Sequence, residues 1–238
     1  MATIAPALRW TEVPPAVLQG EGLEPYRPGE IGILCSGAGL GGEEPRHLIA
    51  YAGQFLVDVA QVAGDAVPRR HQSADEVVLV LGGTLVLTTE ETGHELRIDA
   101  GEAVLIPQGW AGLCRALPAG RWYRQVGIVP HDYFDSACDA LPSGRAPQPI
   151  TLHDGPGRRE VHRGRYAVAT EYLPGACEWT VRAVRDEIVA VIDGTLTLQA
   201  EDGRETFGPG QLVALPMGFT GAAEASAGYR ALTAYWLG

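Results

Sequence analysis

Two stretches of this chain repeat one another. The segment that begins at Gly53 aligns without a gap with the segment that begins at Gly164, 111 residues later. The identical positions include Gly53 and Gly164, Val57 and Val168, Gly64 and Gly175, Asp75 and Asp186, Glu76 and Glu187, Gly83 and Gly194, and Leu85 and Leu196. Further on, GEAVLIPQGWAG from Gly101 matches GQLVALPMGFTG from Gly210 after a slip of two residues. Because a repeat of this length is a structural unit used again, the sequence predicts two copies of one module.

Each copy has the pattern of short β-strands. Segments such as VVLVLGGTLVL (77–87) and IVAVIDGTLTL (188–198) are rich in apolar and β-branched residues, and turn-forming Gly, Pro and Asp separate them. Short, evenly spaced strands are typical of sandwiches and barrels. The sequence therefore predicts an all-β protein made of two barrels of similar size.

The strand that follows Glu76 is apolar at every position, not at every second one. A strand with this pattern is usually covered on both faces. One face would fill its own barrel, and the other would pack on the sister module or on another subunit. A homodimer is therefore an alternative that the sequence leaves open.

A Pro-, Gly- and Arg-rich connector separates the two copies. We expect a domain boundary there, with a first module over residues 1–146 and a second over 147–238. The first part of the connector predicts a short helix that ends before Pro142. The first fifty residues have no counterpart before the second copy, so we expect an extension or an extra layer of strands.

Composition excludes several classes of function. A net charge of −11 argues against nucleic acid and anionic membranes as partners, because both require a basic surface. All 18 basic residues are Arg, which excludes chemistry at a Lys amine. The four Cys are far apart, the N-terminal segment lacks the pattern of a signal peptide, and no apolar run is long enough to span a membrane. These features predict a cytoplasmic protein with free thiols.

Two motifs in each copy resemble those of the cupins. They are GDAVPRRHQSADEVVLVLGG and GEAVLIPQGWAG in the first copy, and GACEWTVRAVRDEIVAVIDG and GQLVALPMGFTG in the second. The chain thus resembles a bicupin, and its D-E pair followed by P-x-G-aromatic-x-G is similar to the ureidoglycine-aminohydrolase-like cupin group. The resemblance implies two double-stranded β-helix (jelly-roll) barrels that are joined by the connector.

The resemblance also implies a metal site, and here the sequence departs from the family. The four ligand positions carry Arg69, His71, Glu76 and Gly112 in the first copy, and Thr180, Arg182, Glu187 and Gly221 in the second. A catalytic zinc normally has three protein ligands, and non-haem iron takes two His and a carboxylate. We therefore expect no cofactor, with a divalent metal on His71 and Glu76 as the alternative for the first barrel.

The first copy has the richer set of chemical groups. Arg69 and His71 share one face of a strand because side chains alternate along it, and Glu76 on the next strand would face them. His71 suits proton transfer near neutral pH, while Glu76 could orient it or act as the base. The alternative interpretation is a core histidine hydrogen-bonded to Glu76. The candidate catalytic residues are His71, Glu76 and Tyr123, and the candidate substrate-binding residues are Arg69, Trp110, Arg124, Arg182 and Glu187.

In the second copy, Arg182 opposite Glu187 would form a structural ion pair or would recognise an anion. The sequence favours an enzyme that acts on a small polar or anionic metabolite by acid–base chemistry, as a lyase, an isomerase or an aminohydrolase. A non-catalytic binding or regulatory protein is the alternative, and a structural pseudo-enzyme is a third.

Two other features are interpreted as unrelated to function. GAGLGG from Gly37 imitates a dinucleotide fingerprint, but the strand–helix alternation that must follow is missing. His153 and His162 lie in the connector, where we interpret them as surface residues.

Overall fold

The computed structural model describes residues 33–34, 46–52, 54–63, 67–71, 74–117, 122–130, 144–201 and 203–237; the side chains of 33–34, 46–52, 58–63, 67–71 and 122–124 lie outside the description. In these ranges all regular secondary structure is β-strand, and the twenty strands form antiparallel sheets. The expected all-β fold is confirmed. The helix expected before Pro142 falls outside the described residues. No helix in the described part is long and apolar enough to cross a membrane.

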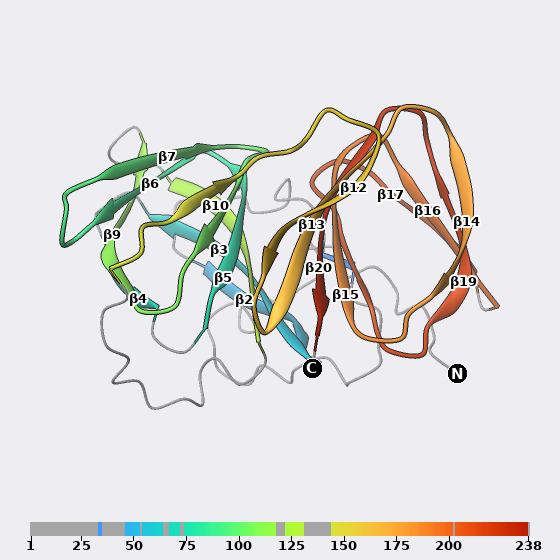
Figure 1. Ribbon diagram of the computed structural model, residues 1–238, viewed down its shortest axis with the longest axis horizontal. Coiled ribbons are helices and arrows are strands. Elements are labelled where there is room, and N and C mark those ends of the chain that lie inside the picture. The colour runs from blue at the N-terminus through green and yellow to red at the C-terminus, as the bar shows by residue number, and fades with distance from the viewer. Residues whose placement is uncertain are drawn as a thin grey trace.

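The first module lies on the left of Figure 1 and consists of two sheets. Its strands are β2 (Arg46–Ala52), β3 (Phe55–Ala63), β4 (Val67–His71), β5 (Glu76–Gly82), β6 (Thr84–Thr89), β7 (Glu95–Asp99), β8 (Ala103–Ile106), β9 (Trp110–Leu117), β10 (Trp122–Pro130) and β11 (Gln148–Ile150). The six-stranded sheet has the order β11-β8-β5-β10-β3-β2, and the four-stranded sheet has the order β4-β9-β6-β7.

The second module repeats this architecture on the right of Figure 1. Its strands are β12 (Gly157–Arg163), β13 (Tyr166–Leu173), β14 (Cys177–Arg182), β15 (Glu187–Asp193), β16 (Leu196–Ala200), β17 (Gly203–Phe207), β18 (Leu212–Leu215), β19 (Thr220–Ala225) and β20 (Tyr229–Trp236), together with β1 (Ile33–Leu34). The sheet orders are β1-β18-β15-β20-β13-β12 and β14-β19-β16-β17.

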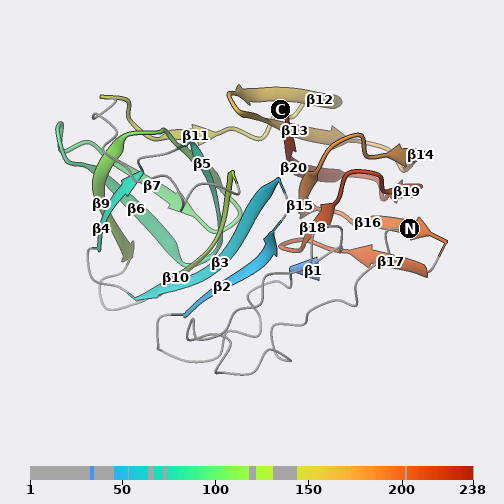
Figure 2. The same cartoon turned by 90° about the horizontal axis from the view of Figure 1, so that it is seen from below.

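The two modules exchange a strand. β11 follows the first copy in sequence and pairs with β8 of the first module, whereas β1 precedes the first copy and pairs with β18 of the second module (Figure 2). In the two six-stranded sheets β1 takes the place of β11, and β12 takes the place of β2. Part of the first fifty residues therefore has a structural counterpart in the second copy. The domain boundary near residue 147 stays a prediction.

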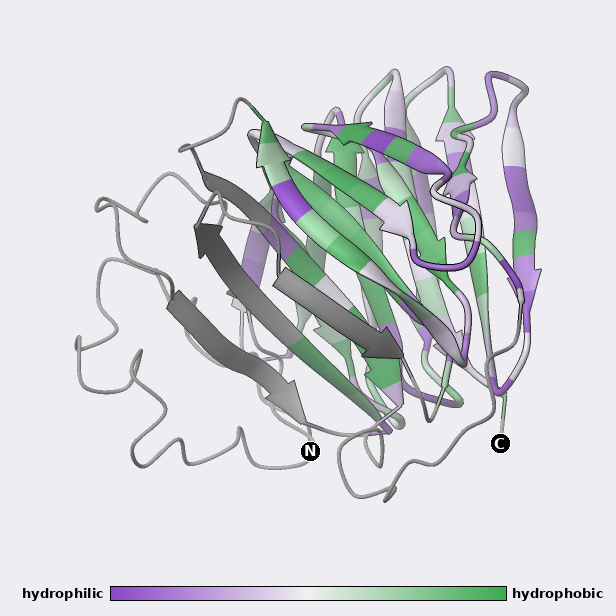
Figure 3. Ribbon diagram, turned by 90° about the vertical axis from the view of Figure 1, so that its left-hand side faces the viewer, coloured by the Kyte–Doolittle hydropathy of each residue, from purple (hydrophilic) through white to green (hydrophobic). Residues whose placement is uncertain are grey.

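The two six-stranded sheets pack against each other through a shared apolar core. Its buried residues are Phe55, Val57, Val77, Leu79, Ala103, Val126, Ile128, Ile150, Tyr166, Val168, Ile188, Ala190, Leu212, Ala214, Leu232 and Ala234. The rings of Phe55 and Tyr166 meet edge-on with their centroids 5.5 Å apart. Hydrophobic residues dominate the middle of the long strands that form this layer (Figure 3). Packing between the sister modules, one of the two expected uses of the apolar faces, is thus what the structure shows.

Alternation along the strands assigns the opposite faces to the barrel interiors. Val77 and Leu79 of β5 point into the shared core, while Val78 and Val80 belong to the core of the first barrel. In β15, Ile188 and Ala190 point into the shared core, while Val189 and Val191 belong to the core of the second barrel. β5 is therefore covered on both faces, as its sequence predicted.

Candidate functional site

Glu76 lies on the interior face of the first barrel. It shares the face of Val78 and Val80, and only 2% of its surface is exposed. A carboxylate at such a position must be paired or protonated, and Glu76 is not without an interaction partner. In the four-stranded sheet of this barrel, β4 pairs with β9, which brings His71 opposite Trp110 and Arg69 opposite Gly112. The backbone positions of Arg69 and His71 thus lie on the wall of this barrel, while their side chains lie outside the description.

Trp110 fills the barrel where the sequence suggested a substrate contact. It is 2% exposed, it belongs to the core of the first barrel, and its Nε1 donates a hydrogen bond to Thr89 Oγ1 at 3.1 Å. A Cβ atom at Gly112 would overlap the Trp110 ring and the carbonyl oxygen of Thr88. The position of the fourth cupin ligand therefore has no room for a side chain.

The register of β10 separates two further candidates from Glu76. Val77, next to Glu76, pairs with Ile128, whereas Arg124 pairs with Gly82 at the other end of β5. Four residues of strand span about 13 Å. Tyr123 and Arg124 are therefore positioned far along the strand from Glu76, and their side chains lie outside the described residues.

The register of β14 corrects the ungapped alignment of the second copy. Gly221 pairs with Val181, so the residue that corresponds to Arg69 is Val181 and not Thr180. Arg182 is exposed, and the neighbours that pack on the barrel core are Trp179 and Val181. Arg182 therefore lies on the outer face of β14 and does not face Glu187 as expected.

The residues of the second barrel do not fit the cupin metal site. Its ligand positions become Val181, Ala183, Glu187 and Gly221, of which only Glu187 can ligate a metal. A Cβ atom at Gly221 would overlap the carbonyl oxygen of Gln199 and would lie 3.0 Å from Phe219. Among the described residues of either barrel, no group of three or more His, Cys, Asp or Glu is placed to hold a metal ion.

The second barrel instead carries a charged cluster around Tyr235. Glu187 shares the interior face with Val189 and Val191 and pairs directly with Tyr235 of β20. The Tyr235 ring contacts two guanidinium groups: the Cζ of Arg158 lies 4.7 Å from the ring centroid, and that of Arg185 lies 4.2 Å from it. Arg185 Nε is 4.0 Å from Glu187 Oε1 and is buried without a hydrogen-bond partner.

Neighbouring carboxylates complete this cluster. The Tyr235 hydroxyl donates to Glu160 Oε2 at 2.6 Å, and Glu160 also accepts two hydrogen bonds from Arg163, both 2.7 Å long. The Arg163 guanidinium and then the Tyr235 hydroxyl lower the pKa of Glu160 to about 2. Glu171 lies opposite Arg158 in the strand pairing, and its pKa shifts in the other direction from that of Glu160. Burial raises the pKa of Glu171; the charge of Arg158 opposes this rise, and the charge of Glu187 adds to it.

The Asp of each D-E pair has a structural role that both modules share. Asp75 Oδ1 accepts the amide of Gln108 at 2.7 Å, and Asp186 Oδ1 accepts the amide of Met217 at 2.8 Å. These amides belong to the two P-x-G turns, which lie between β8 and β9 and between β18 and β19. The repeated Asp therefore fixes the turn that delivers Trp110 or Phe219 to the barrel.

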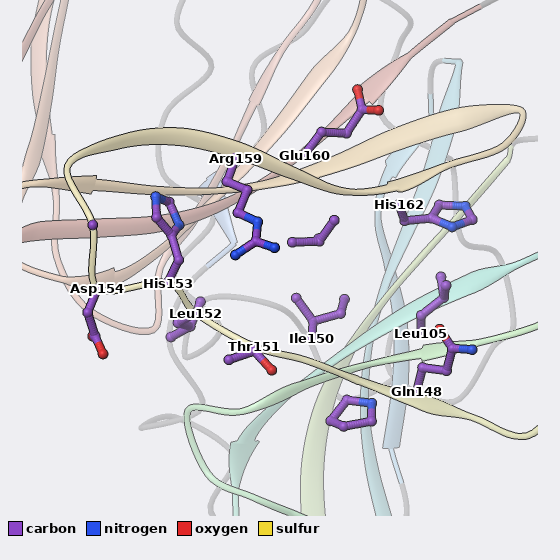
Figure 4. A pocket seen from close by; sticks show the side chains of 13 residues that line it. Leu105, Gln148, Ile150, Thr151, Leu152, His153, Asp154, Arg159, Glu160 and His162 are labelled. Atoms are coloured by element: carbon purple, nitrogen blue, oxygen red, sulfur yellow. The ribbon is translucent and has the colours of Figure 1, made fainter.

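A pocket of about 770 Å³ lies outside both barrels, between the connector and β12. Figure 4 shows the connector segment from Gln148 to Asp154 on one side and β12 on the other. Its lining residues are Leu105, Gln148, Pro149, Ile150, Thr151, Leu152, His153, Asp154, Gly155, Arg159, Glu160, Val161 and His162. Sequence reasoning missed this pocket because its residues come from the connector, from β12 and from Leu105 of β8, and because no motif surrounds His153 or His162. The side chain of His162, which was expected at the surface, is only 12% exposed.

Structural comparison shows what the fold resembles. A cupin 2 conserved barrel domain protein from Leptotrichia buccalis is 12% identical, with a TM-score of 0.62 over 82% of this chain and 89% of the other. A putative glyoxylate-induced protein from Pseudomonas aeruginosa is 17% identical, with a TM-score of 0.59 over 87% and 89%. A salicylate 1,2-dioxygenase from Pseudaminobacter salicylatoxidans is 11% identical, with a TM-score of 0.57 over 76% and 70%. Identities this low establish the fold alone.

Sequence comparison gives a narrower result. No curated protein matches the sequence significantly. The family of EutQ-like cupin domains matches residues 165–231, which run from the start of β13 into β20 and include Glu187 and Gly221. The second module thus contains a cupin domain, in a chain whose fold is that of the cupin-barrel proteins.

Proposed function

We propose that this protein binds a small polar or anionic metabolite inside its second barrel. The observation that carries the proposal is the position of Arg185, whose buried Nε has no hydrogen-bond partner although it lies beside Tyr235 and Glu187. A buried donor without an acceptor is costly, and a bound anion would supply that acceptor. Native interiors leave few such groups unpaired, so this one favours a ligand.

The surrounding groups support an anionic or mixed-charge ligand. Arg158 and Arg185 contact the same tyrosine ring, so two guanidinium groups converge on one place in the barrel. The raised pKa of Glu171 reflects a desolvated carboxyl, which can be neutral more readily than an exposed one. A neutral Glu171 could donate a hydrogen bond to the same ligand.

Substitution of Arg185 tests this proposal. Arg185→Gln should remove a co-purifying small molecule that native mass spectrometry detects on the full-length parent, or should weaken its rebinding at least tenfold, because a charge-assisted hydrogen bond is lost. Arg182→Gln is the matched control, since Arg182 is exposed on the outer face of β14. Equal loss in both variants, or no bound molecule in the parent, would contradict the proposal.

A second candidate function is acid–base catalysis in the first barrel. The burial of Glu76, and the position of His71 on β4 in the other sheet of the same barrel, favour it. In this proposal His71 transfers a proton, Glu76 orients it, and Arg69 holds the substrate anion; lyases, isomerases and aminohydrolases all use such chemistry. Trp110, in contrast, packs in the core of this barrel and donates a hydrogen bond to Thr89.

His71→Asn and Glu187→Gln distinguish the two barrels. If His71 is catalytic, His71→Asn should abolish turnover and leave ligand affinity within about tenfold, the pattern of a lost transition-state interaction. A non-catalytic binder should show altered affinity and no turnover to lose. Loss of activity in Glu187→Gln with no effect of His71→Asn would move the catalytic site to the second barrel.

We propose that the second barrel needs no metal, because only Glu187 could ligate one there. The alternative of a divalent metal on His71 and Glu76 applies to the first barrel alone. Elemental analysis of the full-length protein and of Glu76→Gln and Glu187→Gln tests this. A stoichiometric metal that Glu187→Gln alone removes would contradict the proposal.

A further inference from the structure

The pocket between the connector and β12 is bounded by both modules. Leu105 and β11 belong to the six-stranded sheet of the first module, while β12 is the edge strand of the corresponding sheet in the second. The pocket therefore lies where the exchanged strand crosses from one module to the other. Its volume of about 770 Å³ falls within the range of small-molecule sites, roughly 300–1,000 Å³.

Two adjacent arginines of β12, Arg158 and Arg159, point to opposite faces of the strand. Arg158 pairs with Glu171 and contacts Tyr235 in the second barrel, whereas Arg159 pairs with Thr170 on the opposite face. Figure 4 shows Arg159 extending from β12 into the gap above the connector. Its guanidinium makes no ion pair or hydrogen bond with another described residue, so the pocket contains a positive charge without a counterion.

The two carboxylates at the rim do not neutralise Arg159. Glu160 is engaged by Arg163 and Tyr235, and Asp154 Oδ1 lies 2.9 Å from Arg230. In Figure 4 both carboxylates turn away from the gap. The net charge inside the pocket is therefore that of Arg159.

Two histidines place further donors and acceptors in the pocket. His153 Nδ1 is hydrogen-bonded to Thr170 Oγ1 at 2.8 Å, which fixes the ring and leaves Nε2 for a ligand. His162 Nε2 lies 3.3 Å from Asp75 Oδ2 of the first module, and burial lowers the pKa of this imidazole. Because Asp75 also holds the turn before Trp110, His162 links the pocket to the frame of the first barrel.

The remaining lining is mixed, because the polar side chains of Gln148 and Thr151 lie beside apolar ones. Leu105, Ile150, Leu152 and Val161 line the pocket, and Val161 is 39% exposed. Four apolar side chains beside a guanidinium without an ion pair suit a ligand with one anionic group and an apolar body. A strongly hydrated anion such as sulfate would gain nothing from these side chains.

We propose that this pocket is a second ligand site, separate from the barrels, that binds a small carboxylate with an aromatic or aliphatic body. The carboxylate contacts the Arg159 guanidinium and His153 Nε2, and the body packs on Ile150 and Val161. The site requires both modules, so its occupancy stabilises their packing. It stands independently of the function proposed for the barrels.

Benzoate is the probe that tests this site, because it combines one carboxylate with an apolar ring. Titration of the full-length protein, followed by calorimetry and by the imidazole resonances of His153 and His162, should show saturable binding. Benzamide lacks the charge and acetate lacks the ring, so both should bind at least tenfold more weakly. His153→Gln and His162→Gln assign the resonances.

Arg159→Gln and Arg158→Gln form a matched pair of neighbours on opposite faces of one strand. Arg159→Gln should weaken benzoate at least tenfold, the effect of a lost charge-assisted hydrogen bond, while Arg158→Gln should leave affinity within about twofold. Thermal unfolding checks that both variants remain folded, which their exposure favours. Loss of binding in Arg158→Gln alone would assign benzoate to the barrel and overturn the proposal. Undiminished binding in Arg159→Gln, or no saturable binding of benzoate to the parent, would also overturn it.

Discussion

The two barrels share the residues that fix their turns and differ in the side chains that fill their interiors. In both, an Asp holds the P-x-G turn, an aromatic ring follows, and a Gly leaves room for that ring. The interior of the first barrel closes around Trp110 and leaves Glu76 almost fully buried. The interior of the second keeps Arg185, Glu187 and Tyr235 in contact with one another.

The difference teaches that the repeated residues specify the scaffold and not the chemistry. Asp75 and Asp186 are identical because a backbone amide must be satisfied at the same turn. Side chains that point into the barrels face no such common demand, so they have diverged. A motif match therefore predicts the frame of each barrel better than its ligand.

The largest expected effect comes from breaking the core that both barrels share. Phe55 is fully buried and contacts Tyr166 and Trp236 across the interface. Phe55→Ala should lower the free energy of unfolding by about 4 kcal/mol, as for other large-to-small core substitutions. Urea denaturation of the full chain measures this loss, with exposed Val184→Ala as the control. A loss below about 1 kcal/mol would mean that the barrels do not depend on this interface.

Substitution of the glycine at the fourth ligand position should destabilise the fold in both barrels. Gly112→Ala and Gly221→Ala should each cost about 3 kcal/mol, because the new Cβ overlaps a backbone carbonyl that cannot move freely. Gly112→Ala should be the worse, since its Cβ would also overlap the Trp110 ring. Gly175→Ala, with no heavy atom within 4 Å, is the control. A stable Gly112→Ala would show that the first barrel has room for a fourth ligand after all.

The two aspartates that hold the P-x-G turns should contribute differently to the free energy of unfolding. Asp186 accepts two amides, of Met217 and Gln54, each at 2.8 Å, while Asp75 accepts the amide of Gln108. Asp186→Ala should therefore cost about 2.5 kcal/mol and Asp75→Ala about 1.5 kcal/mol, given the usual value of a hydrogen bond to a charged group. Chemical denaturation at neutral pH gives both values. Arg145 Nη2 also lies 3.6 Å from Asp75 Oδ1. The reverse order would show that Arg145 and His162 stabilise the Asp75 site more than these amides do.

The smallest effect is a pH dependence confined to the second barrel. Burial raises the pKa of Glu171 above its ordinary value of 4.5, so the folded state binds this proton more tightly than the unfolded state does. The parent therefore loses stability as pH rises through the interval above 4.5. Glu171→Gln removes this loss, so the variant should melt slightly higher than the parent at pH 7, and the gain should vanish below pH 4.5. An equal gain at both pH values would show that the effect is not one of protonation.

Much of the fold and part of the candidate site followed from the sequence. The repeat, the short strands and the fully apolar run after Glu76 predicted two β modules with strands covered on both faces, and the structure has these features. The burial of Glu76 also followed, because strand periodicity is local. Arg182 was misplaced because the ungapped alignment slips by one residue in β14, and such a slip turns a side chain to the other face.

What the tertiary structure alone decided is which residues meet. The repeat gave no sign that β1 and β11 cross to the sister sheet, because such short strands carry little pattern and their pairing is long-range. The contact of Tyr235 with Arg158 and Arg185 brings together three separate segments of the chain. Their spacing in the sequence does not predict it. Local periodicity is written in the sequence because it repeats every two residues, whereas a site assembled across strands depends on register and on which edges meet.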